Sequence, residues 1–279
     1  MTSLARHRHE TGSALIATLG IAAFLAALAV LVIHMMVETA HLARDQRVAI
    51  ETDAAFDQAF ARVLWRLRAG GTATYYADPF EIEVEGARLR ATVFSPAGLI
   101  DLNHAPPQVL GPVLAKAGAS DAASLAAAIM DWRDGDDLVS LRGAERSQYE
   151  ALGEVGPANQ AFARTDEVEH VLGMTPEVLD CLTEYGTVSS LASAPDLAVA
   201  PDWVRQALLG DQVTASSASI PVNLGSGDLI GLTLEILVGP QEGQRARILV
   251  RLTGMRDEPY WIQAWDQSAL SAHRCGTNS

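Results

Sequence analysis

The side chains best suited to chemistry are the carboxylates of one short acidic stretch, residues 131–145. It holds five carboxylates and two glycines: Asp131, Asp134, Asp136, Asp137, Glu145, Gly135 and Gly143. Calcium takes about six to eight oxygen ligands from carboxylates, amides and carbonyls on a flexible loop. The density of acidic residues therefore predicts an irregular calcium-binding loop. The alternative is a solvated acidic loop in which Asp134 or Asp131 pairs with Arg133 or Arg142.

The spacing of this stretch invites comparison with an EF-hand. Asp134 and Glu145 stand at the first and twelfth positions of such a loop. However, Leu138 occupies the fifth position, Val139 the sixth, where glycine makes the sharp turn, and Arg142 the ninth. An EF-hand is therefore rejected.

The sequence contains no recognisable catalytic constellation. There is no Gly-x-Ser-x-Gly or His-Glu-x-x-His stretch, and neither cysteine has zinc-like spacing. The histidines after the apolar run are scattered: His34, His41, His104, His170 and His273. His104 suits a helix entry better than a catalytic base, and Gly225-Ser226-Gly227 suits a turn. We expect a protein that is not an enzyme.

The charge balance bears on nucleic acid as a ligand. The 279 residues hold 20 Lys and Arg against 34 Asp and Glu, a formal net charge of -14. Two helix-turn-helix segments within 101–190 resemble helix-hairpin-helix modules, which hold DNA phosphates. Between Gly98 and Ser190, however, fifteen acidic residues face five basic ones, so phosphates would be repelled. No nucleic acid partner is expected, and a membrane-tethered DNA-uptake or DNA-receptor protein is the alternative function.

One apolar run near the start can anchor the chain in a membrane. Residues 13–33 carry no charge, and as a helix they rise about 32 Å, enough to cross a hydrocarbon core of about 30 Å. The basic leader Arg6-His7-Arg8-His9 predicts that the N-terminus stays in the cytoplasm and that the rest is exported. A signal peptide does not fit, because Val37-Glu38-Thr39-Ala40 comes only after a full span. A plain signal anchor and a leader cleaved between Gly12 and Ser13 remain.

The remaining pattern predicts an α+β fold. A long N-terminal helix continues from the anchor to Arg68, with Phe56, Phe60, Val63, Leu64 and Leu67 on one face. Alternating apolar and polar residues predict a hairpin over 80–94. Strand signals return over 229–238, 245–252 and 260–265, separated by Gly239-Pro240 and by Gly254 to Pro259. Between them, residues 101–190 favour short helices. We expect the helix to pack on an antiparallel sheet that a large all-α insertion interrupts.

The expected organisation has six parts. They are a leader (1–12), the transmembrane half of the helix (13–37), the outer helix and first hairpin (38–100), the helical insertion (101–190), the return to the sheet (191–267) and a flexible tail (268–279). Cys181 and Cys275 allow one disulfide in an oxidising compartment. The alternative is a small buried residue at 181 and a free thiol on the tail.

The leader and the insertion together resemble a known family. A short basic leader ending in Gly12, then Ser13 and an unbroken apolar helix, resembles type IV pilins and pseudopilins, most of which carry Glu at the fifth mature position, where this chain has Ala17. Five further segments, in order, resemble the K-type minor pseudopilin of type II secretion systems, whose members lack that glutamate. They are Asp101-Leu102-Asn103-His104-Ala105-Pro106, Ile129-Met130-Asp131-Trp132-Arg133-Asp134-Gly135-Asp136, Gly143-Ala144-Glu145, Pro157-Ala158-Asn159-Gln160-Ala161-Phe162 and Val171-Leu172-Gly173-Met174-Thr175-Pro176-Glu177.

The resemblance implies a specific role. It implies a pseudopilin fold, a subunit that caps the tip of a periplasmic pseudopilus and helps initiate its assembly, and contacts with the I-type and J-type minor pseudopilins and the major pseudopilin. It also implies cleavage and methylation by a prepilin peptidase, a single pass through the Gram-negative inner membrane and calcium binding. The implied calcium ligands are Asp134, Asp136, Asp137 and Glu145, with Asp131 and Asn159 as weaker candidates.

Overall fold

The computed structural model describes residues 10–70, 73–76, 78–210, 221–222, 225–269 and 275. The chain forms two compact units, Met1–Ala54 and Ala55–Ser279. Residues 1–9 of the expected leader and the segment 211–219 lie outside the described residues. So does the expected tail beyond residue 269, apart from Cys275.

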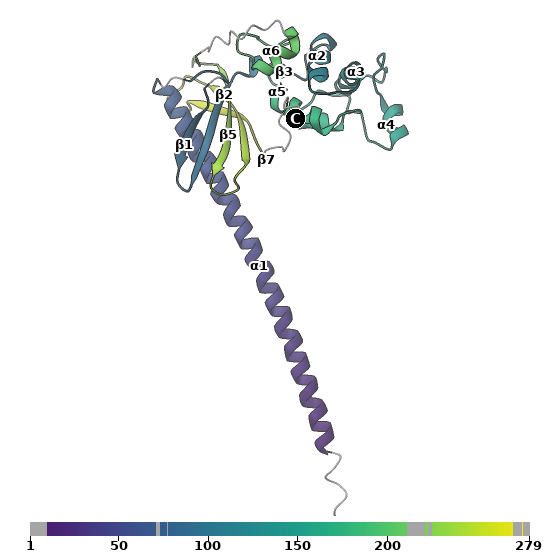
Figure 1. Ribbon diagram of the computed structural model, residues 1–279, viewed down its shortest axis with the longest axis vertical. Helices are drawn as coiled ribbons and strands as arrows, with labels where there is room; N and C mark the ends of the chain where they lie inside the picture. Colours follow the sequence, from purple (N-terminus) through teal and green to yellow (C-terminus); the bar gives the residue numbers. More distant parts are fainter. Residues whose placement is uncertain are drawn as a thin grey trace, which may run out of the picture. The chain divides into compact units, whose positions relative to one another are not determined.

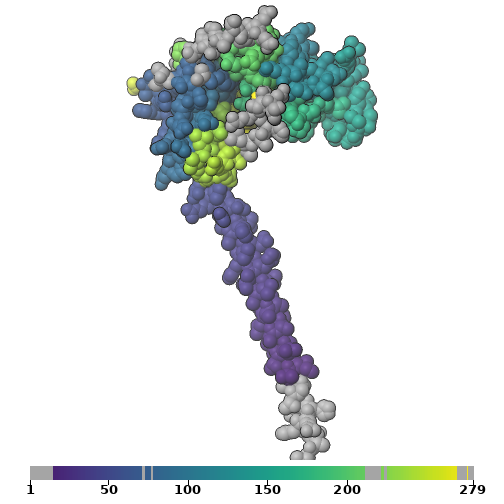
Figure 2. Space-filling model, in the orientation of Figure 1, coloured from purple at the N-terminus to yellow at the C-terminus, as the bar shows by residue number. Residues whose placement is uncertain are grey.

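A single helix, α1, spans Glu10–Arg68 (Figure 1). No glycine or proline interrupts it after Gly20, and the hydroxyl groups of Thr18 and Thr39 donate to the carbonyls of Leu15 and Met36 within the helix. In the first unit it is a rod one helix thick (Figure 2), and its apolar side chains are exposed. Within the described residues, this is one helix long and apolar enough to cross a membrane. An apolar surface of this length fits a membrane anchor.

The last part of α1 belongs to the second unit and carries the predicted apolar stripe. Its five predicted side chains are all buried: Phe56, Phe60, Val63, Leu64 and Leu67. They pack in one core with the inward residues of the sheet. Phe60 meets Tyr260 and Trp265 edge to face, at centroid distances of 5.4 and 5.5 Å. The expected packing of helix on sheet is confirmed.

The sheet has five antiparallel strands in the order β1-β2-β5-β6-β7. The strands are β1 Phe80–Val84, β2 Ala87–Phe94, β5 Leu229–Val238, β6 Gln244–Leu252 and β7 Tyr260–Ala269. All five strands were expected from the sequence, although β7 is longer than predicted. Because β2 pairs directly with β5, the chain between them leaves the sheet and returns to it.

The helical insertion has a core of its own. It contains α2 Pro107–Lys116, α3 Ala122–Arg133, α4 Arg146–Leu152, the 3-10 helix η2 Thr165–His170 and α5 Pro176–Tyr185. Outside it, η1 Pro96–Gly98 precedes the insertion and α6 Asp202–Leu209 follows it. The two ends of the insertion meet where β3 Ile100–Asp101 pairs in parallel with β4 Gly186–Thr187. The expected helical character is confirmed, but the insertion is not entirely α-helical, because the short β3–β4 pair joins its two ends. Helix α4 is an additional helix.

A buried arginine attaches the insertion to the sheet. Arg247 of β6 donates to the backbone carbonyls of Thr183, Glu184 and Gly186, the last two at 3.1 and 3.3 Å. Its guanidinium lies 4.7 Å from the centre of the Phe94 ring. Burial lowers the pKa of Arg247, while its donors are satisfied by carbonyls at the end of α5. This contact fixes the end of the insertion on the sheet.

Cys181 of α5 and Cys275 form a disulfide. Of the two readings of the sequence, the paired one is therefore correct. Residue 275 of the expected flexible tail is covalently tied to the insertion, and residues 268–269 belong to β7.

We expect the Cys275→Ser variant to lose about 2–4 kcal/mol of unfolding free energy, because the bond closes a loop with a sequence separation of 94 and restricts the unfolded chain. Urea denaturation of the full chain in detergent measures the effect. Dithiothreitol should lower the stability of the natural protein equally and leave the variant unchanged. Equal stability of the two oxidised proteins would contradict the prediction.

Candidate metal centre

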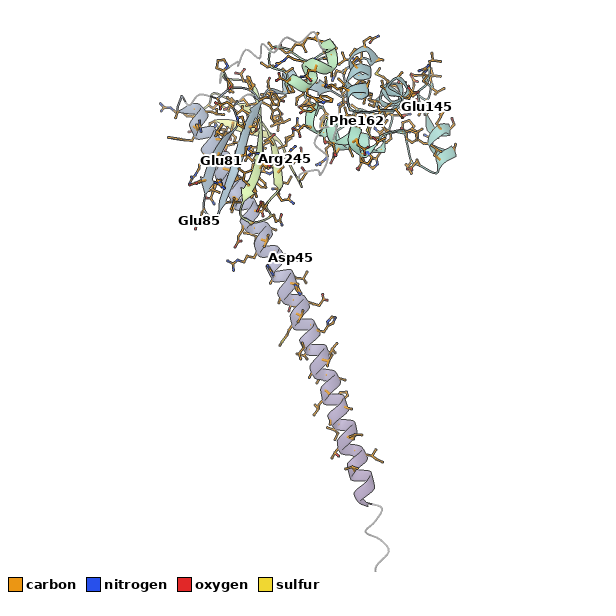
Figure 3. The ribbon with its side chains drawn as sticks, in the orientation of Figure 1. Asp45, Glu81, Glu85, Glu145, Phe162 and Arg245 are labelled. Carbon is orange, nitrogen blue, oxygen red and sulfur yellow. A yellow bond between two sulfur atoms is a disulfide. The ribbon has the colours of Figure 1, made fainter. Side chains whose placement is uncertain are left out.

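The acidic stretch connects two helices of the insertion. Asp131 lies in the last turn of α3, Asp134 is the residue that follows that helix, and Glu145 directly precedes α4 (Figure 3). Helix α3 buries Leu125, Ala128, Ile129 and Trp132. Asp131 falls on this face as well, one turn after Ala128, and is completely buried. Helix α3 thus places the carboxylate of Asp131 in the protein interior, just before the loop begins.

Asp131 is held by the loop itself. Its Oδ2 accepts a hydrogen bond of 3.1 Å from the backbone N–H of Ser140. A Cβ atom at Gly143 would lie 1.9 Å from the same oxygen, so only glycine lets the chain pass this close to the carboxylate. The residue type at 143 is explained by the position of Asp131.

Five buried side-chain oxygens around this loop have no hydrogen-bond partner among the residues that the structure describes. They are Oδ1 of Asp131, Oδ1 of Asp134, Oε1 and Oε2 of Glu145, and Oδ1 of Asn159. Buried polar atoms without partners are rare in native proteins and each carries a free-energy cost of about 1–3 kcal/mol. All five are carboxylate or amide oxygens, which are the ligands that hard divalent cations prefer. The residues present therefore fit a calcium ion.

The electrostatics of the loop point the same way. The pKa of Glu145 is raised by burial and then by the negative charges of Asp131, Asp134 and other aspartates. The pKa of Asp134 is likewise raised by burial and by the charge of Asp136. Such shifts mean that burial, and then the neighbouring negative charges, destabilise the ionised form of these carboxyl groups. A bound cation would remove this repulsion.

The candidates named from the sequence divide into two groups. Asp136 and Asp137 are exposed, and each already accepts a hydrogen bond, from the N–H of Leu138 at 2.9 Å and from Nδ2 of Asn159 at 3.0 Å. Asp134 and Glu145 have buried unpartnered oxygens, and so have the two weaker candidates, Asp131 and Asn159. Burial thus favours Asp131 and Asn159 over Asp136 and Asp137.

Asn159 is brought to the loop by the chain that follows α4. Its Nδ2 donates to the carbonyl of Asp136 at 3.1 Å as well as to Asp137. The amide oxygen is thereby left without a partner. Among the described residues, no three Asp, Glu, His or Cys side chains already converge in the geometry of a metal site. The carboxylates would have to draw together around an ion.

The alternative reading, a loop neutralised by arginine, finds no support in the described contacts of Arg133. That guanidinium donates to the carbonyls of Leu102 and Ala105, the latter at 2.7 Å. It therefore ties α3 to the start of the insertion. Its charge lowers the pKa of Asp134 less than burial and Asp136 raise it.

We expect Gly143→Ala to lower the unfolding free energy by about 1–3 kcal/mol, because the added methyl group overlaps the buried Asp131 carboxylate. Thermal denaturation followed by circular dichroism measures the loss. Gly135→Ala is the matched control, since nothing lies within 4 Å of a Cβ there. Equal Tm values for the two variants would contradict the close approach of Gly143 to the Asp131 carboxylate.

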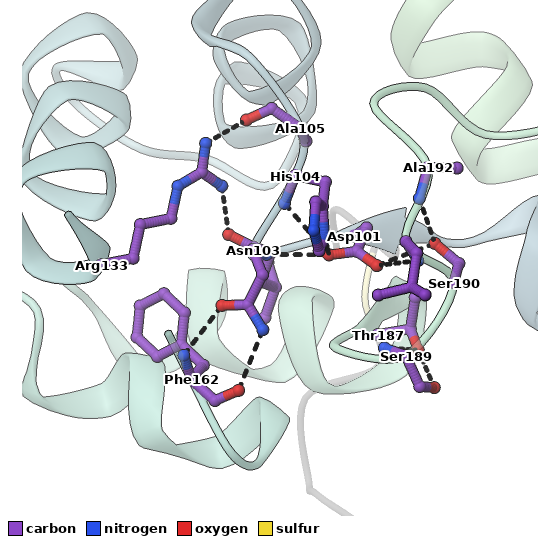
Figure 4. A network of polar contacts seen from close by, with 12 residues as sticks. Asp101, Asn103, His104, Ala105, Arg133, Phe162, Thr187, Ser189, Ser190 and Ala192 are labelled. Atoms are coloured by element: carbon purple, nitrogen blue, oxygen red, sulfur yellow. Dashed lines mark hydrogen bonds and ion pairs between the residues drawn. The ribbon is translucent and has the colours of Figure 1, made fainter. Parts of the chain in front are cut away.

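A second polar network joins the ends of the insertion (Figure 4). The buried Asp101 accepts at Oδ1 from the N–H groups of Asn103 and His104 and from His104 Nδ1, at 2.9, 3.1 and 3.0 Å. Its Oδ2 accepts from Ser190 Oγ and the Leu191 N–H at 2.9 and 2.8 Å. Asp101 thus joins the two ends of the insertion, and His104, just before α2, contributes to this junction.

Asn103 extends this network to the chain after α4. Its amide exchanges two hydrogen bonds with the backbone of Phe162, of 2.8 and 2.9 Å (Figure 4). Phe162 in turn stacks on Trp132 at a centroid distance of 6.2 Å. The Asp101–Pro106 motif therefore has a structural role that its sequence did not reveal.

The basic side chains of the insertion are largely engaged within the protein. Lys116 donates to Gln206, Arg133 to backbone carbonyls, and Arg164 forms ion pairs with Asp166 and Asp266. With fifteen acidic residues against five basic ones between Gly98 and Ser190, this surface repels phosphate. The nucleic-acid alternative gains no support.

The fold defines a class. A long N-terminal helix whose outer part packs on an antiparallel sheet, with a membrane-compatible first part, is the architecture of a pseudopilin, and here a helical domain interrupts the sheet. Residues 101–190 match the family described as type II secretion system (T2SS), protein K. The structure is also similar to a chain of the GspK-GspI-GspJ complex from the type 2 secretion system of enterotoxigenic Escherichia coli.

That similarity has a TM-score of 0.56 at 14% sequence identity, and it covers 83% of this chain and 99% of the other. A search of curated protein sequences gave no match. The family match over residues 101–190 and the fold similarity over most of the chain both support a K-type minor pseudopilin of a type II secretion system. The family is a structural component of the secretion machinery.

Proposed function

We propose that this protein caps the tip of a periplasmic pseudopilus and helps to initiate its assembly. The observation that carries the proposal is Ala17, the fifth residue after Gly12, in an anchor helix without any acidic side chain between Leu15 and Val37. A carboxylate buried in a bundle of anchor helices is costly unless it meets a partner such as the N-terminal amine of a neighbouring subunit. A subunit with no neighbour ahead of it does not need that carboxylate.

The proposal includes processing and partners. The prepilin peptidase would cut between Gly12 and Ser13 and the new N-terminus would be methylated, leaving the first part of α1 in the inner membrane and the second unit, with the last part of α1, in the periplasm. The similar solved structure is a chain of a complex with GspI and GspJ, which supports I-type and J-type minor pseudopilins as partners. The major pseudopilin would follow below them.

The tip position can be tested by labelling. An epitope tag after residue 279 should be detected by immunogold microscopy only at one end of pseudopili sheared from cells that overproduce the major pseudopilin. An epitope on the major subunit serves as the control and should mark the whole length. Labels of this protein spaced along the filament would refute a capping role.

Replacing Ala17 by Glu should disturb assembly, because the carboxylate could pair with the N-terminal amine of a subunit ahead and let this protein enter the filament like an ordinary repeat. We expect secretion to fall at least fivefold and the variant to appear along the filament. Ala22→Glu, also within the apolar run, is the control for general damage to the anchor. Normal secretion and a normal tip position of the Ala17 variant would count against the proposal.

We also propose that the acidic loop binds calcium. The buried unpartnered oxygens of Asp131, Asp134, Glu145 and Asn159 would supply ligands, and Asp136 or Asp137 could complete the shell after giving up their present hydrogen bonds. Bound calcium would neutralise the mutual repulsion of the carboxylates and fix the loop between α3 and α4. Its role would be structural, in keeping with a family that is a structural component of the secretion machinery.

A further inference from the structure

Five large apolar side chains are exposed around the acidic loop. Leu138, Val139 and Leu141 belong to the loop, and Leu152 and Val155 belong to the end of α4 and the chain after it. The exposed fractions of Leu141 and Val155 are 93% and 91%, so these side chains make almost no contact with the rest of the protein. Single exposed leucines are ordinary, but five within residues 138–155 indicate an interaction surface.

The two segments that carry these side chains adjoin the same cluster. The Ser140 N–H donates to Asp131, which fixes the loop segment. Asn159 bonds the loop at Asp136 and Asp137, and a Cβ atom at Gly156 would lie 2.7 Å from the Trp132 and Tyr149 rings, which fixes the second segment. The exposed apolar side chains therefore stand on anchored backbone. We call these five residues the leucine surface.

The negative charge around the leucine surface favours a partner with basic side chains. Between Asp134 and Glu154 there are six carboxylates and only two basic side chains, Arg142 and Arg146, a net charge of -4. Asp136, Asp137, Glu150 and Glu154 are exposed beside the apolar residues. A second copy of this chain or an anionic lipid surface would bring like charge to this rim, whereas lysine or arginine would be attracted.

We propose that the leucine surface docks a segment of a partner protein whose apolar side chains are flanked by lysine or arginine. The apolar residues of the partner would cover the leucines, and its cations would meet the acidic rim. This gives the helical insertion a binding function beyond its place at the filament end. The leucines are not candidate metal ligands, so a failed calcium site and a failed docking surface would be told apart.

The experiment uses the full chain in nanodiscs of phosphatidylcholine and a fluorescent amphipathic 18-residue peptide of leucine and lysine. Fluorescence anisotropy, with empty nanodiscs as background, gives the affinity. We expect the double variant Leu138→Ser, Leu141→Ser to weaken binding at least tenfold, which corresponds to about 1.4 kcal/mol. A peptide with glutamate in place of lysine should also bind at least tenfold more weakly.

The control is Leu191→Ser, which changes a leucine that is 74% exposed outside the surface and should leave the affinity unchanged. Should the double variant melt early, Leu152→Ser with Val155→Ser tests the same surface. Equal binding by a folded surface variant, or equal binding of the glutamate peptide, would overturn the proposal. So would a dimer of the natural protein in ultracentrifugation that the surface variant loses, because the surface would then belong to a second copy.

Discussion

Saturating calcium should raise the Tm of the full chain by about 5–10 °C. A ligand present at about one hundred times its Kd adds about 2.7 kcal/mol, and a unit of this size shifts by about 2–4 °C for each kcal/mol. The physical reason is the loop between α3 and α4, where five buried oxygens lack partners in the described part of the chain. Burial, and then neighbouring negative charges, raise the pKa of Asp134 and Glu145 there. Differential scanning calorimetry with calcium and with EDTA measures the shift.

The difference in stability between the Glu145→Gln variant and the natural chain should change sign between EDTA and calcium. Without calcium the variant should be the more stable protein by about 1 kcal/mol, because one of the repelling buried charges is gone. With calcium it should be the less stable one, because a ligand with full charge is lost. Glu150→Gln, an exposed residue of α4, is the matched control and should behave like the natural protein. A Tm of the natural chain that does not respond to millimolar calcium would eliminate the site.

Replacing Asp101 by alanine should cost about 3–5 kcal/mol, the second large effect. The buried carboxylate accepts from both ends of the insertion, from Asn103 and His104 on one side and from Ser190 and Leu191 on the other. Its removal leaves buried donors without an acceptor and opens the closure at β3 and β4. Urea denaturation in EDTA measures the loss. Asp196→Ala, an exposed aspartate that accepts one local hydrogen bond, is the control.

The same group predicts a pH dependence. Burial alone would raise the pKa of Asp101, but the hydrogen bonds from His104, Ser190 and Leu191 outweigh it and hold the pKa below the ordinary value of 3.8. The contribution of Asp101 to stability is therefore complete above about pH 4 and is lost as the pH falls through the lower folded value. Comparing Asp101→Asn with the natural chain in EDTA, the stability difference should shrink below pH 4. A constant difference down to pH 2 would show that Asp101 is not ionised in the folded protein.

Local patterns were sufficient for the regular elements of the pilin-like part. Alternation of apolar and polar residues has a period of two, so it identified β1 and β2. Strand signals between turn segments identified β5 and β6, and all four predictions lie within a residue of the observed ends. The stripe from Phe56 to Leu67 likewise identified the face of α1 that packs on the sheet. Helix α4 was missed, because its seven residues offer only Tyr149 as a buried apolar side chain.

The candidate site was predictable in place but not in detail. Carboxylate density located the loop, yet Asp131, the most deeply buried carboxylate of the loop, was only a weaker candidate from the sequence. Asp131 lies one turn after Ala128, on the same face of α3 as Ile129 and Trp132. This helical spacing could have indicated that its carboxylate is buried. Asn159 and the pairing of Cys181 with Cys275 depend on tertiary contacts between distant segments, which no local spacing encodes.

The central claim is that this chain is the K-type subunit of a minor pseudopilin complex, and the most direct test is its stoichiometry. The affinity-tagged full chain is co-produced with the I-type and J-type minor pseudopilins of the same cell, extracted in mild detergent, and measured by native mass spectrometry. We predict one complex that contains one copy of each of the three proteins. Purification of the tagged chain alone, or as a polymer of itself without the other two, would contradict the account.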